Sequence, residues 1–216
     1  TLSGAGRLLR IDAATRQTTG DLALGAGPRA LAISANGGRV FVTRFLSPRD
    51  WAEVWEVSAS AMTLTRTFRI PKAGGDANRD GTASGRGTLN YLTNIAISLD
   101  GTSAWVVGTK PNVERGLLIG PDLDSDNTVR AMVAELDLVA NRFARAIDVD
   151  NSDSPTALAL SPLGDYLFVT LQGADAVTVL DTLLMDVAAG LGSSVTRLGT
   201  GAAPRGVAVD AATGRT

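Results

Sequence analysis

A chain of 216 residues can bury a sizeable core, yet this one contains neither histidine nor cysteine and so lacks the side chains of several common reactions. A Ser-His-Asp or Cys-His nucleophile, a zinc site of the usual kind and an attached haem are therefore excluded within it. The formal net charge of −2 does not favour nucleic acid as a partner, and the sequence shows no membrane span.

One phrase recurs along the chain: a strand of small apolar residues, a turn that contains serine, and a strand rich in valine, phenylalanine and threonine. Its central alanines, at positions 32, 96, 159 and 208, lie 64, 63 and 49 residues apart. The last spacing is close to the roughly 40 to 50 residues of a four-stranded propeller blade, and the first two leave room for insertions. The repeat predicts an all-β propeller or partial propeller of four-stranded antiparallel blades, part of a seven-bladed ring.

The expected strands, named A to D within each blade, follow in chain order. Residues 1–27 hold a partial blade with strands at 8–12 and 18–24. Three full blades and a last strand A are then expected, at 28–92, 93–154, 155–202 and 203–216. Their predicted strands lie at 30–34, 39–45, 52–58 and 63–70; at 94–98, 103–109, 129–137 and 142–149; and at 156–161, 165–171, 175–181 and 194–199. These segments are rich in β-branched and aromatic residues and are separated by turn residues.

The two terminal segments do not add up to a whole blade, because neither supplies a strand B. We therefore expect a piece of a longer chain. A complete four-bladed ring with an unseen strand is the alternative.

The repeat at residues 27–34 (GPRALAIS) and 40–43 (VFVT) resembles the YVTN-type bacterial propeller repeat. Other phrases resemble the propeller region of large exported bacterial proteins that also carry di-haem cytochrome c peroxidase-like modules: RGTLNYL at 86–92, NVERG at 112–116, TVRAMV at 128–133 with LD at 136–137, and SPLGDYLF at 161–168. The resemblance implies a periplasmic or extracellular protein. Any haem would belong to the remainder of the parent chain or to a partner protein, because this chain cannot attach one.

Two long insertions are expected on the same face of the molecule. The first, at 71–93, joins strand D to the next strand A, and the second, at 110–128, joins strand B to strand C. Both connections return to the end of the blades at which strand A begins, which we call the top face. Long loops on a rigid scaffold often carry function, so the candidate site is placed there.

The first insertion contains half of a calcium-binding motif. Asp76, Asn78 and Asp80 alternate as oxygen ligands would, and Gly81 permits the sharp turn, but Gly87 stands where the motif needs a glutamate. A calcium site and an Asx-rich surface turn are both compatible with this pattern.

The second insertion repeats the alternation with Asp122, Asp124 and Asp126, and it has Val133 in place of the final glutamate. Calcium or a solvated acidic loop would each relieve the repulsion among the three carboxylates. A third acidic group is expected only to cap a strand end: Asp148, Asp150, Asn151 and Asp153.

Basic residues at the top face offer another kind of site. Alignment of the repeats places Arg29 and Arg205 at one position just before strand A, near the axial opening of a propeller. They would hold an anionic ligand or the carboxylates of a partner, or else bond neighbouring loop carbonyls. Three further cations are candidates for this surface: Lys110, Arg115 and Arg130. Most aromatic residues are expected to pack between blades, with Trp51 and Tyr91 as candidate ligand contacts.

Two functions from different classes remain. The first is a non-catalytic binding module whose top-face loops dock a partner domain or ligand, including a haem or redox module. The second is a calcium-assisted hydrolase of the lactonase or phytase kind. The first is favoured because no acid–base pair is visible and no catalytic residue can be named.

Overall fold

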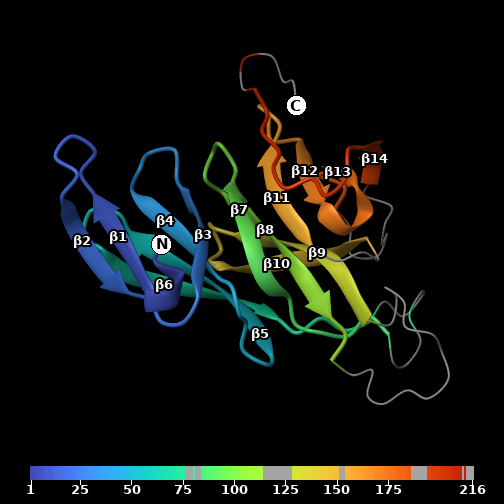
Figure 1. The fold of residues 1–216 in the computed structure, drawn as a ribbon, viewed down its shortest axis with the longest axis horizontal. Coiled ribbons are helices and arrows are strands. Elements are labelled where there is room, and N and C mark those ends of the chain that lie inside the picture. The colour runs from blue at the N-terminus through green and yellow to red at the C-terminus, as the bar shows by residue number, and fades with distance from the viewer. Residues whose placement is uncertain are drawn as a thin grey trace.

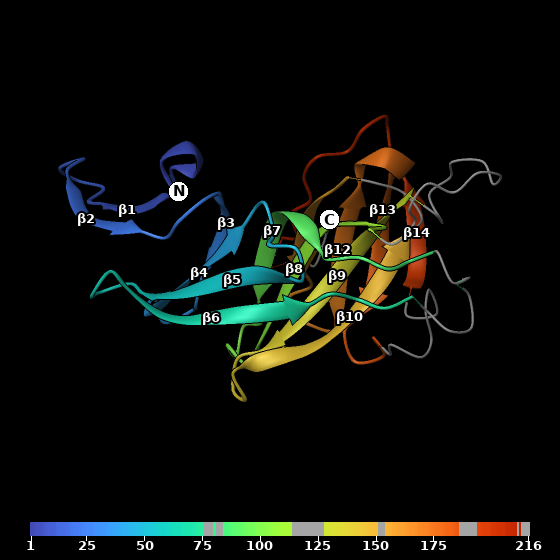
Figure 2. The ribbon, with the colours of Figure 1, turned by 90° about the horizontal axis from the view of Figure 1, so that it is seen from below.

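The computed structural model describes residues 1–75, 80, 84–113, 128–150, 154–185, 194–210 and 212. Within these residues the chain forms one two-stranded and three four-stranded antiparallel sheets, so the all-β prediction is confirmed. Figures 1 and 2 show the sheets following one another in chain order from one end of the molecule to the other.

The strands have the following bounds. The two-stranded sheet contains β1 (Arg7–Ile11) and β2 (Thr18–Ala23). The first full blade contains β3 (Pro28–Ile33), β4 (Arg39–Arg44), β5 (Trp51–Ser58) and β6 (Thr63–Pro71). The second contains β7 (Asn90–Ile97), β8 (Ser103–Pro111), β9 (Val129–Asp137) and β10 (Arg142–Asp150). The third contains β11 (Pro155–Leu160), β12 (Tyr166–Leu171), β13 (Ala176–Asp181) and β14 (Ser194–Gly199). Two short 3₁₀ helices, η1 (Ser3–Ala5) and η2 (Gln172–Ala174), were not expected.

The strand order in each four-stranded sheet is that of a propeller blade, with consecutive strands paired. The first strands of successive blades lie against each other, β3 against β7 and β7 against β11. The described sheets form an open row (Figure 1), so the expected seven-bladed ring stays a prediction.

The prediction of a last strand A, within residues 203–216, is wrong. Residues 201–210 contain no strand, although they carry the repeated phrase. A strand A pairs with the strand B that follows it, and no such strand lies in the part of the chain that the structure describes. Two hydrogen bonds tie this segment to the third blade: Thr156 Oγ1 donates to the Pro204 carbonyl oxygen (3.1 Å), and the Ala203 backbone N–H donates to Asp175 Oδ1 (2.7 Å).

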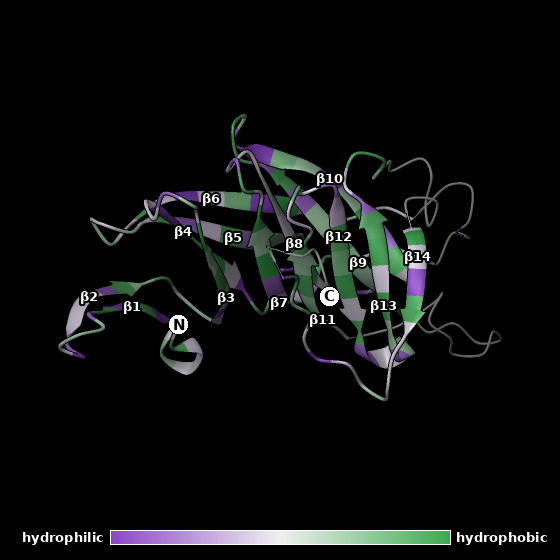
Figure 3. Ribbon diagram, turned by 90° about the horizontal axis from the view of Figure 1, so that it is seen from above, coloured by the Kyte–Doolittle hydropathy of each residue, from purple (hydrophilic) through white to green (hydrophobic). Residues whose placement is uncertain are grey.

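Three apolar cores lie between neighbouring sheets, because successive side chains of a strand point to opposite faces. On β4, Phe41 belongs to the core between the first and second blades, and Val42 to the core shared with Leu8 of the N-terminal sheet. On β8, Val106 faces the first blade and Trp105 faces the third. Figure 3 shows hydrophobic residues in the strands of all three full blades.

The repeated serine shapes the turn between strands A and B. Ser98 Oγ donates to Asp100 Oδ1 (2.6 Å) and accepts the backbone N–H of Ser103 (2.9 Å). Ser34 makes the equivalent bonds in the first blade. In the third blade, Ser161 Oγ likewise accepts the backbone N–H of Tyr166, but it donates to Asp165. The glycine of this turn has a positive φ, +72° at Gly101, which disfavours other residues. The most regular part of the repeat is therefore structural.

Candidate functional site

A cavity of about 580 Å³ opens between the second and third blades. It lies at the bottom face, the end of the blades that carries the A-to-B and C-to-D turns. We call it the inter-blade pocket. Its lining residues come from both blades: Ser98, Leu99, Asp100, Thr102, Ser103, Trp105, Glu135 and Arg145 from the second, and Pro162, Leu163, Gly164, Thr182 and Leu183 from the third.

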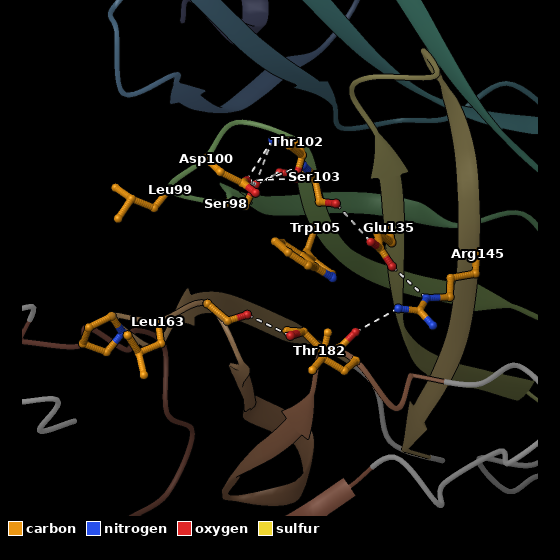
Figure 4. A pocket seen from close by; sticks show the side chains of 13 residues that line it. Ser98, Leu99, Asp100, Thr102, Ser103, Trp105, Glu135, Arg145, Leu163 and Thr182 are labelled. Carbon is orange, nitrogen blue, oxygen red and sulfur yellow. Dashed lines mark hydrogen bonds and ion pairs between the residues drawn. The ribbon is translucent and has the colours of Figure 1, made fainter.

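Three of these residues lie side by side across the second blade. The strand register pairs Trp105 on β8 with Glu135 on β9, and Glu135 with Arg145 on β10. Arg145 Nε donates to Glu135 Oε2 (2.7 Å), and its Nη2 reaches the Thr182 carbonyl oxygen of the third blade (2.8 Å). Ser103 Oγ donates to Glu135 Oε1 (3.2 Å; Figure 4). Each oxygen of the carboxylate thus has a donor.

Trp105 contributes a buried donor without an acceptor. The residue is 4% exposed, and its indole Nε1–H has no hydrogen-bond partner in the structure described. Figure 4 shows the indole between the Ser103 and Glu135 side of the second blade and Thr182 of the third. A buried polar group of this kind costs free energy unless water or a ligand supplies the missing partner. The pocket is therefore suited to an occupant with polar groups.

The rim of the pocket is apolar. Leu99 is 79% exposed, Leu163 is 89% exposed and Leu183 is 81% exposed. Both Leu99 and Leu163 lie in A-to-B turns, Leu99 one residue after the repeated Ser98 and Leu163 two residues after Ser161. Exposed apolar side chains gathered around a polar recess are typical of surfaces that bind other molecules.

Asp100 adds a negative charge to the same rim. Its carboxylate accepts hydrogen bonds from Ser98 Oγ and from the Thr102 backbone N–H (3.0 Å). These bonds favour the ionised form and lower the pKa of Asp100 below its ordinary value.

A second group of charges is buried at the top of the second blade. Lys110 Nζ lies 2.6 Å from Asp148 Oδ1, and Arg130 Nη1 lies 3.0 Å from Asp148 Oδ2. Arg130 also pairs with Asp80, whose side chain is only 1% exposed. We call these four residues the buried ion network.

Burial acts differently on the two cations of this network. It lowers the pKa of the Lys110 ammonium, and the neighbouring Asp148 opposes only part of this effect. Burial also disfavours the charged form of Arg130, but hydrogen bonds to Asp80 and Asp148 outweigh it and raise the pKa of the guanidinium. These pairs compensate the charges that burial removes from water.

The predicted top-face cations divide into two groups. Lys110 and Arg130 are 3% and 2% exposed, so a docking partner cannot reach them in this arrangement. Arg29 and Arg205 are exposed, and the Arg29 guanidinium lies 5.3 Å from the centre of the Phe45 ring. Partner binding by Arg29 and Arg205 stays a prediction.

The predicted calcium ligands lie mostly outside the described residues, as does Arg115: Asp76, Asn78, Asp122, Asp124 and Asp126. Among the described residues no group of three acidic side chains is arranged to hold a metal ion. Asp80 is the one member of the predicted set that can be placed, and its carboxylate is bound to Arg130. Calcium binding therefore stays a prediction.

The two aromatic candidates have partners within the fold. Trp51 Nε1 donates to Glu53 (2.8 Å), and Arg69 lies over the Trp51 ring at 4.7 Å. The Tyr91 ring packs against Phe45, with ring centres 5.3 Å apart. These contacts account for the two residues without a ligand.

The residues of the inter-blade pocket were missed by the sequence analysis. The signal that would have found them is the register: Trp105, Glu135 and Arg145 fall on neighbouring strands at one level of the sheet. The first blade has the same sequence of residue types at its matching level, Phe41, Glu56 and Arg66.

Comparison with known proteins reveals similarity of fold but no family. No protein-family description matches the sequence, and no curated protein gives a significant match. Solved structures do. A functionally unknown protein from Desulfotomaculum acetoxidans is 14% identical with a TM-score of 0.60, over 96% of this chain and 54% of that one. Hydrazine synthase from Kuenenia stuttgartiensis is 16% identical with a TM-score of 0.43, over 94% of this chain and 83% of that one.

The first of these similarities shows a shared fold alone, and this chain spans about half the length of that protein. The second score is too low to support an argument. In the part of the chain that the structure describes, no helix has the length and apolarity needed to cross a bilayer.

Proposed function

We propose that this chain is a non-catalytic binding module that recognises a segment of a partner protein through the inter-blade pocket. The observation that carries the proposal is the buried, unpartnered Nε1–H of Trp105 beneath a rim of exposed leucines. A polar recess with an apolar rim matches the usual anatomy of a recognition site, in which a few polar groups fix the ligand and apolar groups supply contact area.

The pairing of Glu135 supports binding rather than hydrolysis. A general base needs a carboxylate that can reach and accept a substrate proton. Both oxygens of Glu135 already accept hydrogen bonds, from Arg145 and from Ser103. The group is held as a fixed negative charge in the wall, which is useful for recognising a cation.

The sequence resemblance adds a wider setting to this proposal. The module would belong to a larger exported bacterial protein, periplasmic or extracellular, and a haem or redox module of the same parent would dock on its top face. Arg29 and Arg205, both exposed, are the residues proposed for that contact. Electrostatic docking of this kind should weaken on Arg29→Glu with Arg205→Glu and on addition of salt.

Calcium-assisted hydrolysis of lactones or phosphate esters remains the alternative. Its ligands are the acidic residues of the two insertions, and the only one described, Asp80, is occupied by Arg130. No described contact favours this function over binding.

Peptide display tests the proposed function directly. A random-peptide library is selected on the wild-type chain and on a Ser103→Arg variant, whose longer side chain should fill the pocket. Peptides enriched on the wild type alone would support pocket-dependent binding. Equal enrichment on both proteins, or none, would refute it. Hydrolysis of a lactone or of p-nitrophenyl phosphate by the wild type, lost in Asp76→Ala with Asp122→Ala, would favour the enzyme instead.

A further inference from the structure

The two interfaces between full blades are built on the same pattern. In each of the two blades, the strand register pairs an alanine, an aromatic residue, a glutamate and an arginine across four neighbouring strands. These residues are Ala32, Phe41, Glu56 and Arg66 in the first blade, and Ala96, Trp105, Glu135 and Arg145 in the second. In each, the glutamate and arginine form an ion pair, 3.0 Å and 2.7 Å long. In each, the arginine also bonds to the next blade, at Asn141 or at Thr182.

The interfaces differ at one position on strand B. Arg39 lies two residues before Phe41, and Ser103 lies two residues before Trp105, so both side chains point toward the following blade. The Arg39 guanidinium lies 5.4 Å from the centre of the Phe41 ring, and its Nη2 donates to the Gly101 carbonyl oxygen (3.0 Å). The first interface therefore carries its own bound guanidinium.

The second interface has an aromatic ring and a turn carbonyl like those that contact Arg39, but, among the described residues, it has no guanidinium of its own between them. Trp105 replaces Phe41, and indole is the better partner for a cation. Gly164 holds the turn position of Gly101, and its carbonyl accepts one hydrogen bond, from Thr182 Oγ1 (2.8 Å), which leaves a second lone pair. Ser103 is too short to cross the gap and bonds to Glu135 instead. The cavity lies at this place.

We propose that the inter-blade pocket binds the guanidinium group of an arginine side chain supplied by a partner protein. This inference rests on the proposed function and names its ligand. The cation would lie on Trp105, donate to the Gly164 carbonyl and face the carboxylates of Glu135 and Asp100. The exposed Leu99, Leu163 and Leu183 would contact the residues beside that arginine.

The charges of the two interfaces agree with this assignment. The first holds Arg39 and Arg66 for one glutamate, whereas the pocket holds Arg145 for Glu135 and Asp100. One added cation would balance the two carboxylates of the pocket. The Trp105 Nε1–H still needs an acceptor, which a water or a backbone carbonyl of the same partner segment would provide.

Titration with small probes tests the proposal. N-acetyl-arginine amide is added to the isotope-labelled protein, and the indole N–H signals of its three tryptophans are followed by NMR. The Trp105 signal, assigned from its loss in Trp105→Phe, should shift and saturate. The neutral isostere N-acetyl-citrulline amide should bind about tenfold more weakly, because it lacks the charge that interacts with the ring.

Two variants exchange the interfaces and serve as matched controls. Ser103→Arg places an internal guanidinium in the pocket, so the Trp105 response to the probe should disappear. Arg39→Ser should lower the melting temperature and open a second site, and the arginine probe, but not the citrulline probe, should restore part of the loss. Equal binding of both probes, or an unchanged response in Ser103→Arg, would overturn the proposal. Display peptides that depend on the pocket but lack arginine would overturn it while leaving the proposed function intact.

Discussion

The buried ion network should make Asp148 one of the most sensitive positions of the fold. Its carboxylate contacts Lys110 at 2.6 Å and Arg130 at 3.0 Å, and the side chains of both cations are 3% exposed. Among the described ion pairs, Asp148→Ala would leave Asp80 as the carboxylate for two buried cations. Removal of one partner from a buried pair typically costs about 3–5 kcal/mol, because a charge is left uncompensated out of water.

The lower end of that range applies here, since the Asp148 side chain is itself 14% exposed and water can enter where it was removed. We expect a loss of about 3 kcal/mol in the free energy of unfolding. For a chain of this size that corresponds to a fall of roughly 6–12 °C in the melting temperature.

Urea denaturation followed by circular dichroism measures this loss, and Asp21→Ala is the matched control. Asp21 pairs with Arg7 at 2.6 Å, but the two side chains are 45% and 39% exposed. Asp21→Ala should lower the urea midpoint of unfolding by an amount several-fold smaller than the decrease caused by Asp148→Ala. Similar small effects of the two substitutions would refute the view that burial makes the network important.

Three further predictions concern the turns, the sheet interior and calcium. Ser98→Ala should lower the free energy of unfolding by about 1–2 kcal/mol and speed hydrogen exchange at the Ser103 amide, because the Ser98 Oγ accepts that N–H. An unchanged exchange rate would contradict the turn assignment. Gly108→Ala should lower the free energy of unfolding by about 1–3 kcal/mol, since a Cβ there would lie 2.5 Å from the Asn90 carbonyl oxygen. Gly199→Ala, with open space around it, should be nearly neutral. Calorimetric titration should detect calcium binding that is lost in Asp76→Ala; equal heats from the two proteins would exclude a site in the first insertion.

The last prediction concerns pH. Because the pKa of Asp100 is lowered on folding, its contribution is present above the unfolded value of about 3.9 and is lost as the pH falls through the folded value. Stability should therefore fall more steeply below about pH 4 in the wild type than in Asp100→Asn. Parallel curves for the two proteins would show that Asp100 does not contribute.

The sequence by itself determined the strands and the turns between them. Alternating β-branched residues and a serine followed by glycine specify a local conformation, because the bonds that hold it join residues a few positions apart. Ser98, Asp100 and the Ser103 amide illustrate this, because the hydrogen bonds that join them lie within one turn. The same phrase did not form a strand at residues 204–209, since a strand also needs a partner to complete its backbone hydrogen bonds.

Only the tertiary structure decided where charged and aromatic side chains meet. Lys110 and Arg130 were predicted as cations of the top-face binding surface, but both are buried against Asp148, which lies on another strand. The inter-blade pocket depends on the size of a single residue, Ser103, relative to a gap whose far wall lies more than 50 residues along the chain. Contacts between blades are set by packing across that gap, and no local pattern in the sequence reports its width.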